Sequence, residues 1–260
     1  TGNAVDRRSI DTQNGFYNSL DNSITWNKDF SQKFAQVAPG ASGSVSFNFS
    51  PLPSVDTLSD PSINIEVSIS GKQPLEGNTT NAVNSTDSQI IRITSNLGLA
   101  TKILYYSGPF ANTGPIPPVA EKETTYTVVW SLSNTNNSIS GAQVTSSLPP
   151  WVRFVGSISP TSEDLKYDPD TKQIVWKIGA IPKNLNSTGQ GREVSFQIAF
   201  TPSLSQVNSS PVLINDAVLT GNDDFANVDM SVNRGSLNTI LTNDPAFQTG
   251  DGRVLDSGTQ

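Results

Sequence analysis

The sequence predicts an all-β protein built as two tandem β-sandwiches, the first of them incomplete at its N-terminal side. Several segments alternate apolar and polar residues with the period of two that half-buried strands show. Residues typical of turns separate these segments, and one set of segments recurs later in the chain. No apolar pattern with a period of 3.6 residues is long enough to predict a helix.

Five segments in the first part of the chain have the character of strands. The clearest is residues 63–69, in which every second residue is isoleucine or valine. This pattern places one face of the strand in a core and the other in water. The other four segments are residues 24–26, 45–51, 89–94 and 99–106, and the polar residues 71–87 are expected to form a long loop.

Residues 124–202 are the best patterned part of the chain. Residues 126–132 and 194–200 alternate large apolar side chains with small polar ones, and residues 167–179 lie between them with Trp176 in an apolar run. These segments predict the central strands of the second sandwich. Weaker strands are expected at residues 211–220, 228–232 and 237–241, with a short one at residues 253–255.

The segment at residues 108–118 contains four prolines. Proline has no backbone N–H and a fixed φ, so this segment cannot continue the interior of a sheet. We expect it to be a short, stiff linker. The predicted domains are therefore residues 1–107 and residues 119–260.

Internal similarity supports this division. Tyr17 to Trp26 matches Tyr167 to Trp176 at an offset of 150 residues, and residues 43–51 match residues 192–202 with two extra residues in the second copy. Residues 98–104 match residues 235–241, and Phe110 matches Phe247. The first copy has no counterpart of residues 124–160, and this absence is expected to leave four apolar side chains partly uncovered: Ile24, Trp26, Phe47 and Phe49.

Three explanations account for the shortened first copy. The missing strands could precede residue 1 in a longer protein, which is the explanation we favour. A neighbouring chain could instead donate a strand. The first domain could also simply be smaller than the second.

Composition excludes several classes of function. The chain has no cysteine and no histidine, so it lacks a thiol nucleophile, a thiolate metal site and the commonest general base. Its net charge of −7 and its scattered basic residues disfavour nucleic acid. No apolar run approaches the length of a membrane-spanning helix. We expect no enzyme activity, no cofactor and no membrane insertion of this segment.

The motifs of the second half resemble the tandem immunoglobulin-like repeat known as domain of unknown function eleven. The matching residues are Tyr126 to Val128, Asn134 to Asn137, Val144 to Pro149, Tyr167 to Gly179 and Val194 to Phe200; Ser146 stands where the family often has aspartate. The resemblance implies immunoglobulin-like sandwiches of the kind found on bacterial and archaeal surface proteins. The Gly-Pro-Ile-Pro-Pro segment is similar to the linkers between such repeats on surface proteins of small-genome candidate-phyla bacteria.

These expectations combine into one functional prediction. The chain is expected to be a structural module of an extracellular protein, such as a surface layer, stalk or filament. If a neighbouring chain donates a strand, that strand would complete the first sandwich. Its partners would be copies of itself or neighbouring domains. The alternative is an adhesin or carbohydrate-binding module with a site in the loops at one end of a sandwich.

Candidate binding residues each have a simpler structural interpretation. The four tryptophans could form a sugar-binding platform, but the alternation predicts that Trp26, Trp130 and Trp176 lie in the core. Trp151 follows two prolines, so we expect it to be partly exposed, with a core position still favoured. Residues 168–170 and 222–224 could bind calcium, although their composition is also typical of turns.

Carboxylate pairs and sequons complete the candidates. Glu163 with Asp164, or Asp223 with Asp224, could be imagined as a hydrolase pair, but neighbouring residues do not face each other across a cleft. Six asparagines lie in Asn-x-Ser/Thr sequons. Five are in predicted loops and could carry glycan if the host glycosylates the protein: Asn78, Asn84, Asn136, Asn186 and Asn208. The sixth, Asn48, lies in a predicted strand.

Overall fold

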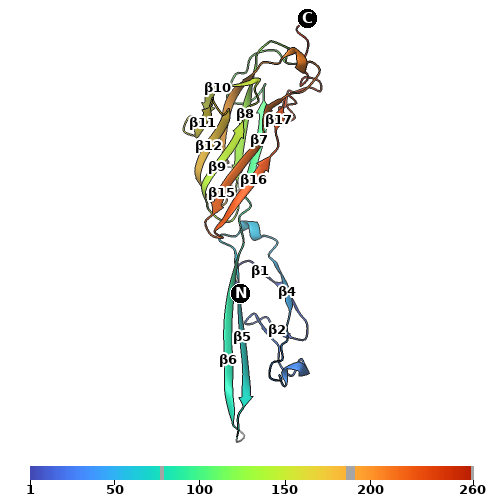
Figure 1. The fold of residues 1–260 in the computed structure, drawn as a ribbon, viewed down its shortest axis with the longest axis vertical. Coiled ribbons are helices and arrows are strands. Elements are labelled where there is room, and N and C mark those ends of the chain that lie inside the picture. The colour runs from blue at the N-terminus through green and yellow to red at the C-terminus, as the bar shows by residue number, and fades with distance from the viewer. Residues whose placement is uncertain (77–78, 186–190, 259–260) are drawn as a thin grey trace. The chain divides into compact units, whose positions relative to one another are not determined.

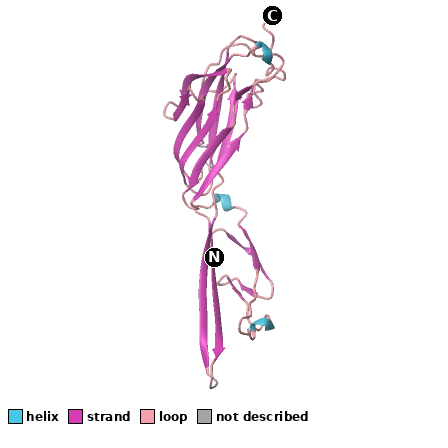
Figure 2. Cartoon of the chain, in the orientation of Figure 1, coloured by secondary structure: helices cyan, strands magenta, loops and turns pink. Residues whose placement is uncertain are grey.

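The computed structural model describes residues 1–76, 79–185 and 191–258, and the chain divides into two compact units, Thr1–Ile93 and Thr94–Gln260. The all-β prediction is confirmed: strands dominate both units (Figures 1 and 2). The only helices in the described residues are three single turns of 3-10 helix, η1 (Gln32–Phe34), η2 (Val55–Thr57) and η3 (Leu204–Gln206).

The second unit is a two-sheet sandwich. One sheet has the strand order β10-β13-β8-β7, and the other has the order β11-β12-β9-β15-β16. The strands of the first sheet are β7 (Gly98–Leu104), β8 (Thr124–Ser133), β10 (Val152–Ser159) and β13 (Arg192–Phe200). Those of the second are β9 (Ile139–Ser147), β11 (Asp164–Asp168), β12 (Gln173–Ile181), β15 (Ala217–Asp223) and β16 (Val228–Arg234).

Alternate residues of the central strands form the core of this sandwich. The side chains of Trp130, Trp176 and Phe196 are completely buried, and the rings of Trp130 and Phe196 meet edge to face with centroids 5.0 Å apart. Aromatic side chains bury the largest apolar areas available to a core. The alternation seen in the sequence therefore gives the inward face of each sheet. A small third sheet pairs β14 (Val212–Ile214) with β17 (Leu237–Asn238).

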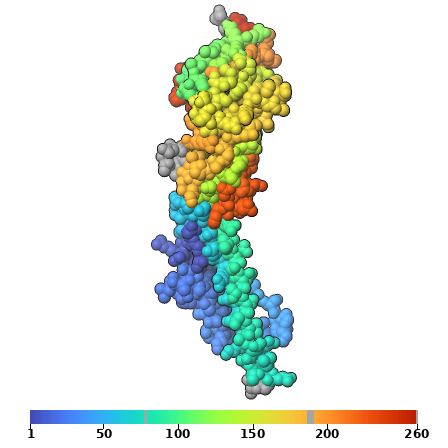
Figure 3. Space-filling model, turned by 90° about the vertical axis from the view of Figure 1, so that its left-hand side faces the viewer, coloured from blue at the N-terminus to red at the C-terminus, as the bar shows by residue number. Residues whose placement is uncertain are grey.

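The first unit contains three separate two-stranded sheets. These pair β1 (Val5–Thr12) with β4 (Phe47–Pro51), β2 (Phe16–Asn18) with β3 (Ser23–Thr25), and β5 (Ser62–Pro74) with β6 (Thr80–Arg92). Among the residues of strands β5 and β6, Ile63 alone is buried, and the space-filling view shows atoms of both strands at the surface (Figure 3).

The three strand pairs of the first unit correspond to three strand pairs of the second. In chain order, β1-β4, β2-β3 and β5-β6 match β10-β13, β11-β12 and β15-β16. Both β1 and β10 carry an irregularity in the middle of their pairing. If β8 and β9 were taken out of the second sandwich, its two sheets would separate into these same three pairs. The first unit therefore repeats three strand pairs of the second and has no strand in the places of β7, β8 and β9.

The β2-β3 hairpin confirms the offset of 150 residues in atomic detail. Tyr17 lies opposite Ile24, and Tyr167 lies opposite Ile174. Each turn has a left-handed residue at the same place, Asn22 with φ of 57° and Lys172 with φ of 56°. In each turn, the side chain that ends the first strand also accepts a hydrogen bond from the backbone N–H two residues later. The two hairpins share one local structure.

Three details of the predicted repeat are corrected. Residues 5–12 form β1, the counterpart of β10, so within residues 124–160 only β8 and β9 lack counterparts. The helical turns η2 and η3 follow Pro53 and Pro202, with Ser54 and Ser203 at their N-caps, so the copies align at an offset of 149 without extra residues. The third predicted match has different surroundings in its two copies, because β7 pairs with β8 whereas β17 pairs with β14.

Two further predictions about the first half are corrected. The boundary between the units lies after Ile93, and residues 108–118 lie inside the second unit instead of linking two domains. Thr113 explains this placement, because its N–H donates to Thr125 Oγ1 at 2.7 Å and its carbonyl accepts from the Thr125 N–H at 2.8 Å. The prolines of residues 108–118 keep this segment out of a regular strand, but they do not keep it from packing against β8. The predicted loop at residues 71–87 is largely strand. The prediction missed it because its many Ser, Thr and Asn residues give no alternation of apolar and polar side chains.

Candidate functional site

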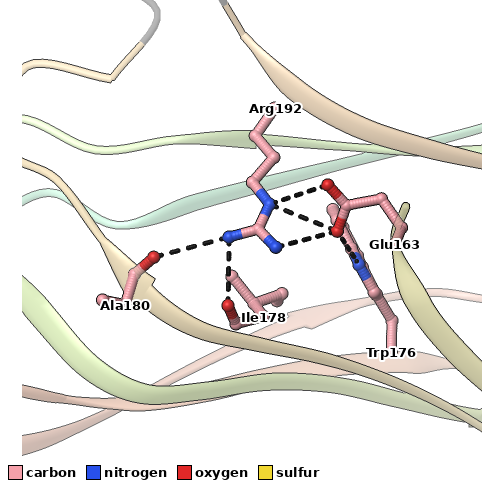
Figure 4. Close-up of polar contacts among 5 residues, drawn as sticks. All are labelled: Glu163, Trp176, Ile178, Ala180 and Arg192. Atoms are coloured by element: carbon pink, nitrogen blue, oxygen red, sulfur yellow. Dashed lines mark hydrogen bonds and ion pairs between the residues drawn. The ribbon is translucent and has the colours of Figure 1, made fainter. Parts of the chain in front are cut away.

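A partly buried ion pair connects three strands of the second sandwich (Figure 4). The guanidinium of Arg192, at the start of β13, contacts the carboxylate of Glu163, just before β11, at 2.8 Å. The same carboxylate accepts a hydrogen bond of 2.8 Å from Trp176 Nε1 on β12, and Arg192 Nη1 donates to the Ile178 carbonyl at 3.0 Å. Only 11% of the Glu163 side chain is exposed. We call Glu163, Trp176 and Arg192 the clamp.

The clamp favours an ionised carboxylate. Burial of Glu163 alone would raise its pKa, but hydrogen bonds from Arg192 and Trp176, together with the positive charge of Arg192, outweigh this and hold the pKa below its ordinary value. A general acid near neutral pH needs a raised pKa. The environment of Glu163 is therefore suited to holding strands together and unsuited to acid catalysis.

The first unit retains the tryptophan of the clamp without its charges. Gln13 and Gly43 stand at the positions of Glu163 and Arg192 in the aligned copies. Trp26 Nε1 donates instead to the Gln13 carbonyl at 3.1 Å. The hydrogen bond that the indole donates is thus kept at the equivalent position, while the ion pair is specific to the complete sandwich.

A second buried carboxylate, Asp223, fixes the entry of the chain into the second unit. It is completely buried and accepts hydrogen bonds from the N–H of Ser95 at 2.8 Å and from Asn137 Nδ2 at 2.8 Å. The N–H groups of Phe225 and Ala226 also donate to it. A buried charge is stable only when donors surround it in this way. Asp223 therefore anchors residue 95 to the loops between strands.

Asp244 has a similar role in the C-terminal segment. It is 4% exposed, and its carboxylate accepts from the N–H groups of Tyr105 and Tyr106 at 2.6 and 2.8 Å. This contact joins residues far apart in the sequence, at the end of β7 and beyond β17. Nearby, Val254 is completely buried, and Val119 and Leu255 form an isolated bridge. The C-terminal segment is thus part of the sandwich.

The carboxylate candidates make the local contacts of turns and anchors. Across residues 1–76, 79–185 and 191–258, no cluster of three or more acidic side chains could hold a metal ion. Asp168 accepts from the Asp170 N–H at 3.0 Å and from Thr171 Oγ1 at 2.8 Å, which are contacts of a turn. Asp223 is occupied by the anchor described above. The interpretation of both acidic segments as turns is therefore favoured by the contacts.

The tryptophans occupy three different environments. Trp130 and Trp176 are completely buried, as expected, but Trp26 is only half-buried. The core position favoured for Trp151 is wrong, because this side chain is 40% exposed. Its Nε1 donates to the Val212 carbonyl at 2.8 Å, so the indole is fixed with part of its ring in solvent.

The five candidate glycosylation sites also differ. Asn84 and Asn208 are exposed, and both remain candidates. Asn136 is completely buried and its Oδ1 accepts from Thr135 Oγ1 at 2.6 Å, so the folded protein does not present it to a glycosylating enzyme. Asn78 and Asn186 lie outside the described residues. The loop assignment of Asn136 gave no indication of its burial.

The free strand edges of the first unit are the feature that sequence reasoning located most closely. In the second sandwich, β8 covers one edge of β13, and β9 lies between β12 and β15. The corresponding edges of β3 and β4 have no paired strand among the described residues, whereas the edge of β5 is hydrogen-bonded by residues 1–4 at Ser62 and Asn64 and has no paired strand beyond them. The adjoining apolar cluster consists of Trp26, Phe47 and Phe49, with ring centroids 6.2 and 5.8 Å apart. Unpaired edges of this kind are templates for strand addition.

No helix in the described part of the chain has the length and apolar character needed to span a membrane.

Among known proteins, only solved structures show a similarity to this chain. No protein-family model matches the chain, and no curated protein matches it. It is similar to BcpA, the major pilin subunit of Bacillus cereus, with 10% identity and a TM-score of 0.31 over 76% of this chain and 49% of that chain. It thus spans about half the length of that pilin.

Two further structures show likeness at the same level. The full-length major pilin SpaD of Corynebacterium diphtheriae has 10% identity and a TM-score of 0.36, covering 91% of this chain and 61% of that one. The C-terminal domain of the AgI/II polypeptide BspA of Streptococcus agalactiae has 12% identity and a TM-score of 0.31, covering 92% and 82%. Such low identities and scores do not decide the role of this chain.

Proposed function

We propose that this chain is a structural module of an extracellular protein, such as a surface layer, stalk or filament. The observation that carries the proposal is the repeated plan, because β1-β4, β2-β3 and β5-β6 reproduce three strand pairs of the complete sandwich. Repetition of one unit is an economical way to build an extended protein. The buried charges of the second unit connect strands and loops, which suits a mechanical role.

The absence of cysteine and the abundance of Ser, Thr and Asn on exposed strands are compatible with a surface location. Immunogold labelling of intact source cells with antibody against the second unit tests this directly. Label on the intact cells supports the proposal, and label seen only after lysis contradicts it. Electron microscopy of the purified protein then shows whether it forms filaments, lattices or single particles.

A carbohydrate-binding role is the second candidate, and the exposed indole of Trp151 favours it. A fixed, partly exposed aromatic ring can stack on a sugar. Glycan-array binding by the wild-type chain that is lost in Trp151→Ala would support this role. Equal signals from both proteins would mean that glycan binds elsewhere on the chain, and no signal from either would leave the structural role.

A further inference from the structure

The edges left free on β3, on β4 and on the part of β5 that follows Asn64 define a surface for a partner of known shape. In the second unit, the same surface is filled by β8 and β9, which hydrogen-bond to β13, β12 and β15. The covered side chains there are completely buried, as Ile174, Trp176, Phe196 and Ile198 show. Their counterparts in the first unit are only half-buried: Ile24, Trp26, Phe47 and Phe49.

Burial at β4 shows the same contrast. Val194 is completely buried against the core of the complete sandwich, whereas its counterpart Val45 is 46% exposed. Val67 and Ile69 on β5 are 50% and 69% exposed. Removing such side chains from water is the main favourable term in strand association. The first unit therefore presents both unpaired backbone and the apolar residues that a partner would cover.

In place of the upstream origin favoured from the sequence, we propose that a second polypeptide chain completes the first unit by docking a two-stranded ribbon with the sequence pattern of β8 and β9, because the apolar side chains and strand edges that the ribbon would cover are accessible in the folded unit. The ribbon does not come from β8 and β9 of another copy of this chain. Those two strands are already paired on both edges, β8 with β13 and β7, and β9 with β12 and β15. The inference rests on the proposed function only for its biological setting, since the docking itself follows from the duplicated fold.

The aligned copies fix the register of the ribbon. On β13, Val194, Phe196 and Ile198 lie opposite Trp130, Val128 and Tyr126. The offset of 149 residues transfers these positions to Val45, Phe47 and Phe49. The first ribbon strand thus places large apolar residues opposite all three.

The second ribbon strand is fixed in the same way by β12. Trp176 lies opposite Val144 and Ile174 lies opposite Ser146. At the offset of 150 residues, an apolar residue lies opposite Trp26 and a small polar residue lies opposite Ile24. A shift of one residue would turn the apolar side of the ribbon to solvent, so the register is strongly specified.

Disulfide trapping tests this register cleanly, because the chain has no cysteine of its own. The probe is residues 124–147 of this chain carried at the end of a soluble protein. Gln197 lies opposite Thr127 in the second unit, and Asn48 is the counterpart of Gln197. Asn48→Cys in the full chain should therefore crosslink to Thr127→Cys in the probe, since directly opposite strand residues have a separation that a disulfide can bridge.

The matched control uses a neighbouring position on the same strand face. Ala199 lies opposite Thr125, and Ser50 is the counterpart of Ala199. Ser50→Cys should crosslink to Thr125→Cys, and each mismatched pair should give about 10-fold less product. A probe with Val128→Ser and Trp130→Ser should give no product above background, because its apolar face is lost.

Every other result overturns the proposal. A positive control places residues 124–150 directly before Ala4, where they fill the same surface within one chain. Trapping in this graft without trapping of the separate probe means that the ribbon must be part of the same polypeptide. Equal trapping of matched and mismatched pairs means nonspecific contact, and crosslinked pairs of the Asn48→Cys chain alone mean self-association. A failure of surface labelling would not alter any of these outcomes.

Discussion

The two units of this chain share three strand pairs, and the second unit adds the central strands β8 and β9, the edge strand β7 and the small β14-β17 sheet. The second unit buries Trp176 completely, in the same core cluster as Trp130 and Phe196. The first unit places Trp26 in the same hairpin but leaves it half-buried, because no central strands close the core over it. Local hairpin structure thus survives without a sandwich, whereas burial requires the central strands.

The largest expected effect is at the duplicated tryptophans. Trp176→Ala should lower the free energy of unfolding of the second unit by about 4 kcal/mol, because it leaves a cavity in a closed core. Trp26→Ala should cost the first unit about 1 kcal/mol, because its site is already open to water. Urea unfolding followed separately in each unit measures both values. Equal losses would contradict the comparison.

The buried anchor of the second unit should give the next largest effect. Asp223→Ala removes the acceptor for Ser95, Asn137, Phe225 and Ala226, and should cost about 3 kcal/mol because buried donors lose their partner. The exposed Asp87→Ala in the first unit is the matched control and should change stability by less than about 0.5 kcal/mol. Thermal unfolding of both variants compares them.

The clamp should contribute less, and its contribution should depend on pH. Arg192→Met leaves Glu163 buried without its cation and should cost about 2 kcal/mol at neutral pH. In the wild type, the lowered pKa of Glu163 gives stability that is fully present above the ordinary value of 4.5 and is lost as pH falls through the lower folded pKa. The stability difference between the two proteins should therefore shrink in acid. A difference that stays constant from pH 7 to pH 3 would refute the role of the ion pair.

The smallest effect should be a gain in stability. The hydroxyl of Tyr126, on one of the strands that the first unit lacks, is buried with no hydrogen-bond partner among the described residues. Tyr126→Phe should therefore stabilise the second unit by up to about 1 kcal/mol. Urea denaturation of both proteins measures the change in the free energy of unfolding, provided that its dependence on urea concentration is the same in both. Clear destabilisation would mean that the hydroxyl has a partner in solution.

Much of this comparison could be predicted from the sequence. The alternation in residues 126–132 and 194–200 identified central strands, and the match of Tyr17 to Trp26 with Tyr167 to Trp176 identified the duplication, because large apolar side chains mark an inward face. β1 was missed because its residues are mostly polar, and β5 and β6 were recognised only in part for the same reason. Pairing in such strands depends on backbone hydrogen bonds, which leave no periodic signal.

The buried polar contacts were harder to predict. Glu163 and Arg192 are 29 residues apart, and Asp223 is 128 residues from Ser95, so only the folded arrangement brings them together. The burial of Asn136 was missed for the same reason. The prolines at residues 108–118 suggested a linker because they exclude regular strands, but they do not exclude packing through neighbours such as Thr113.

Residue-level amide hydrogen exchange on the isolated, unmodified chain tests the central claim most directly. If the first unit repeats three strand pairs of the second without its central strands, amides of β12, β13 and β15 should be protected to near the global stability of their unit. Amides of β3, of β4 and of the part of β5 that follows Asn64 should exchange at least about 100-fold faster, since one edge of each is open. Equal protection of both sets in a monomeric chain would contradict the account.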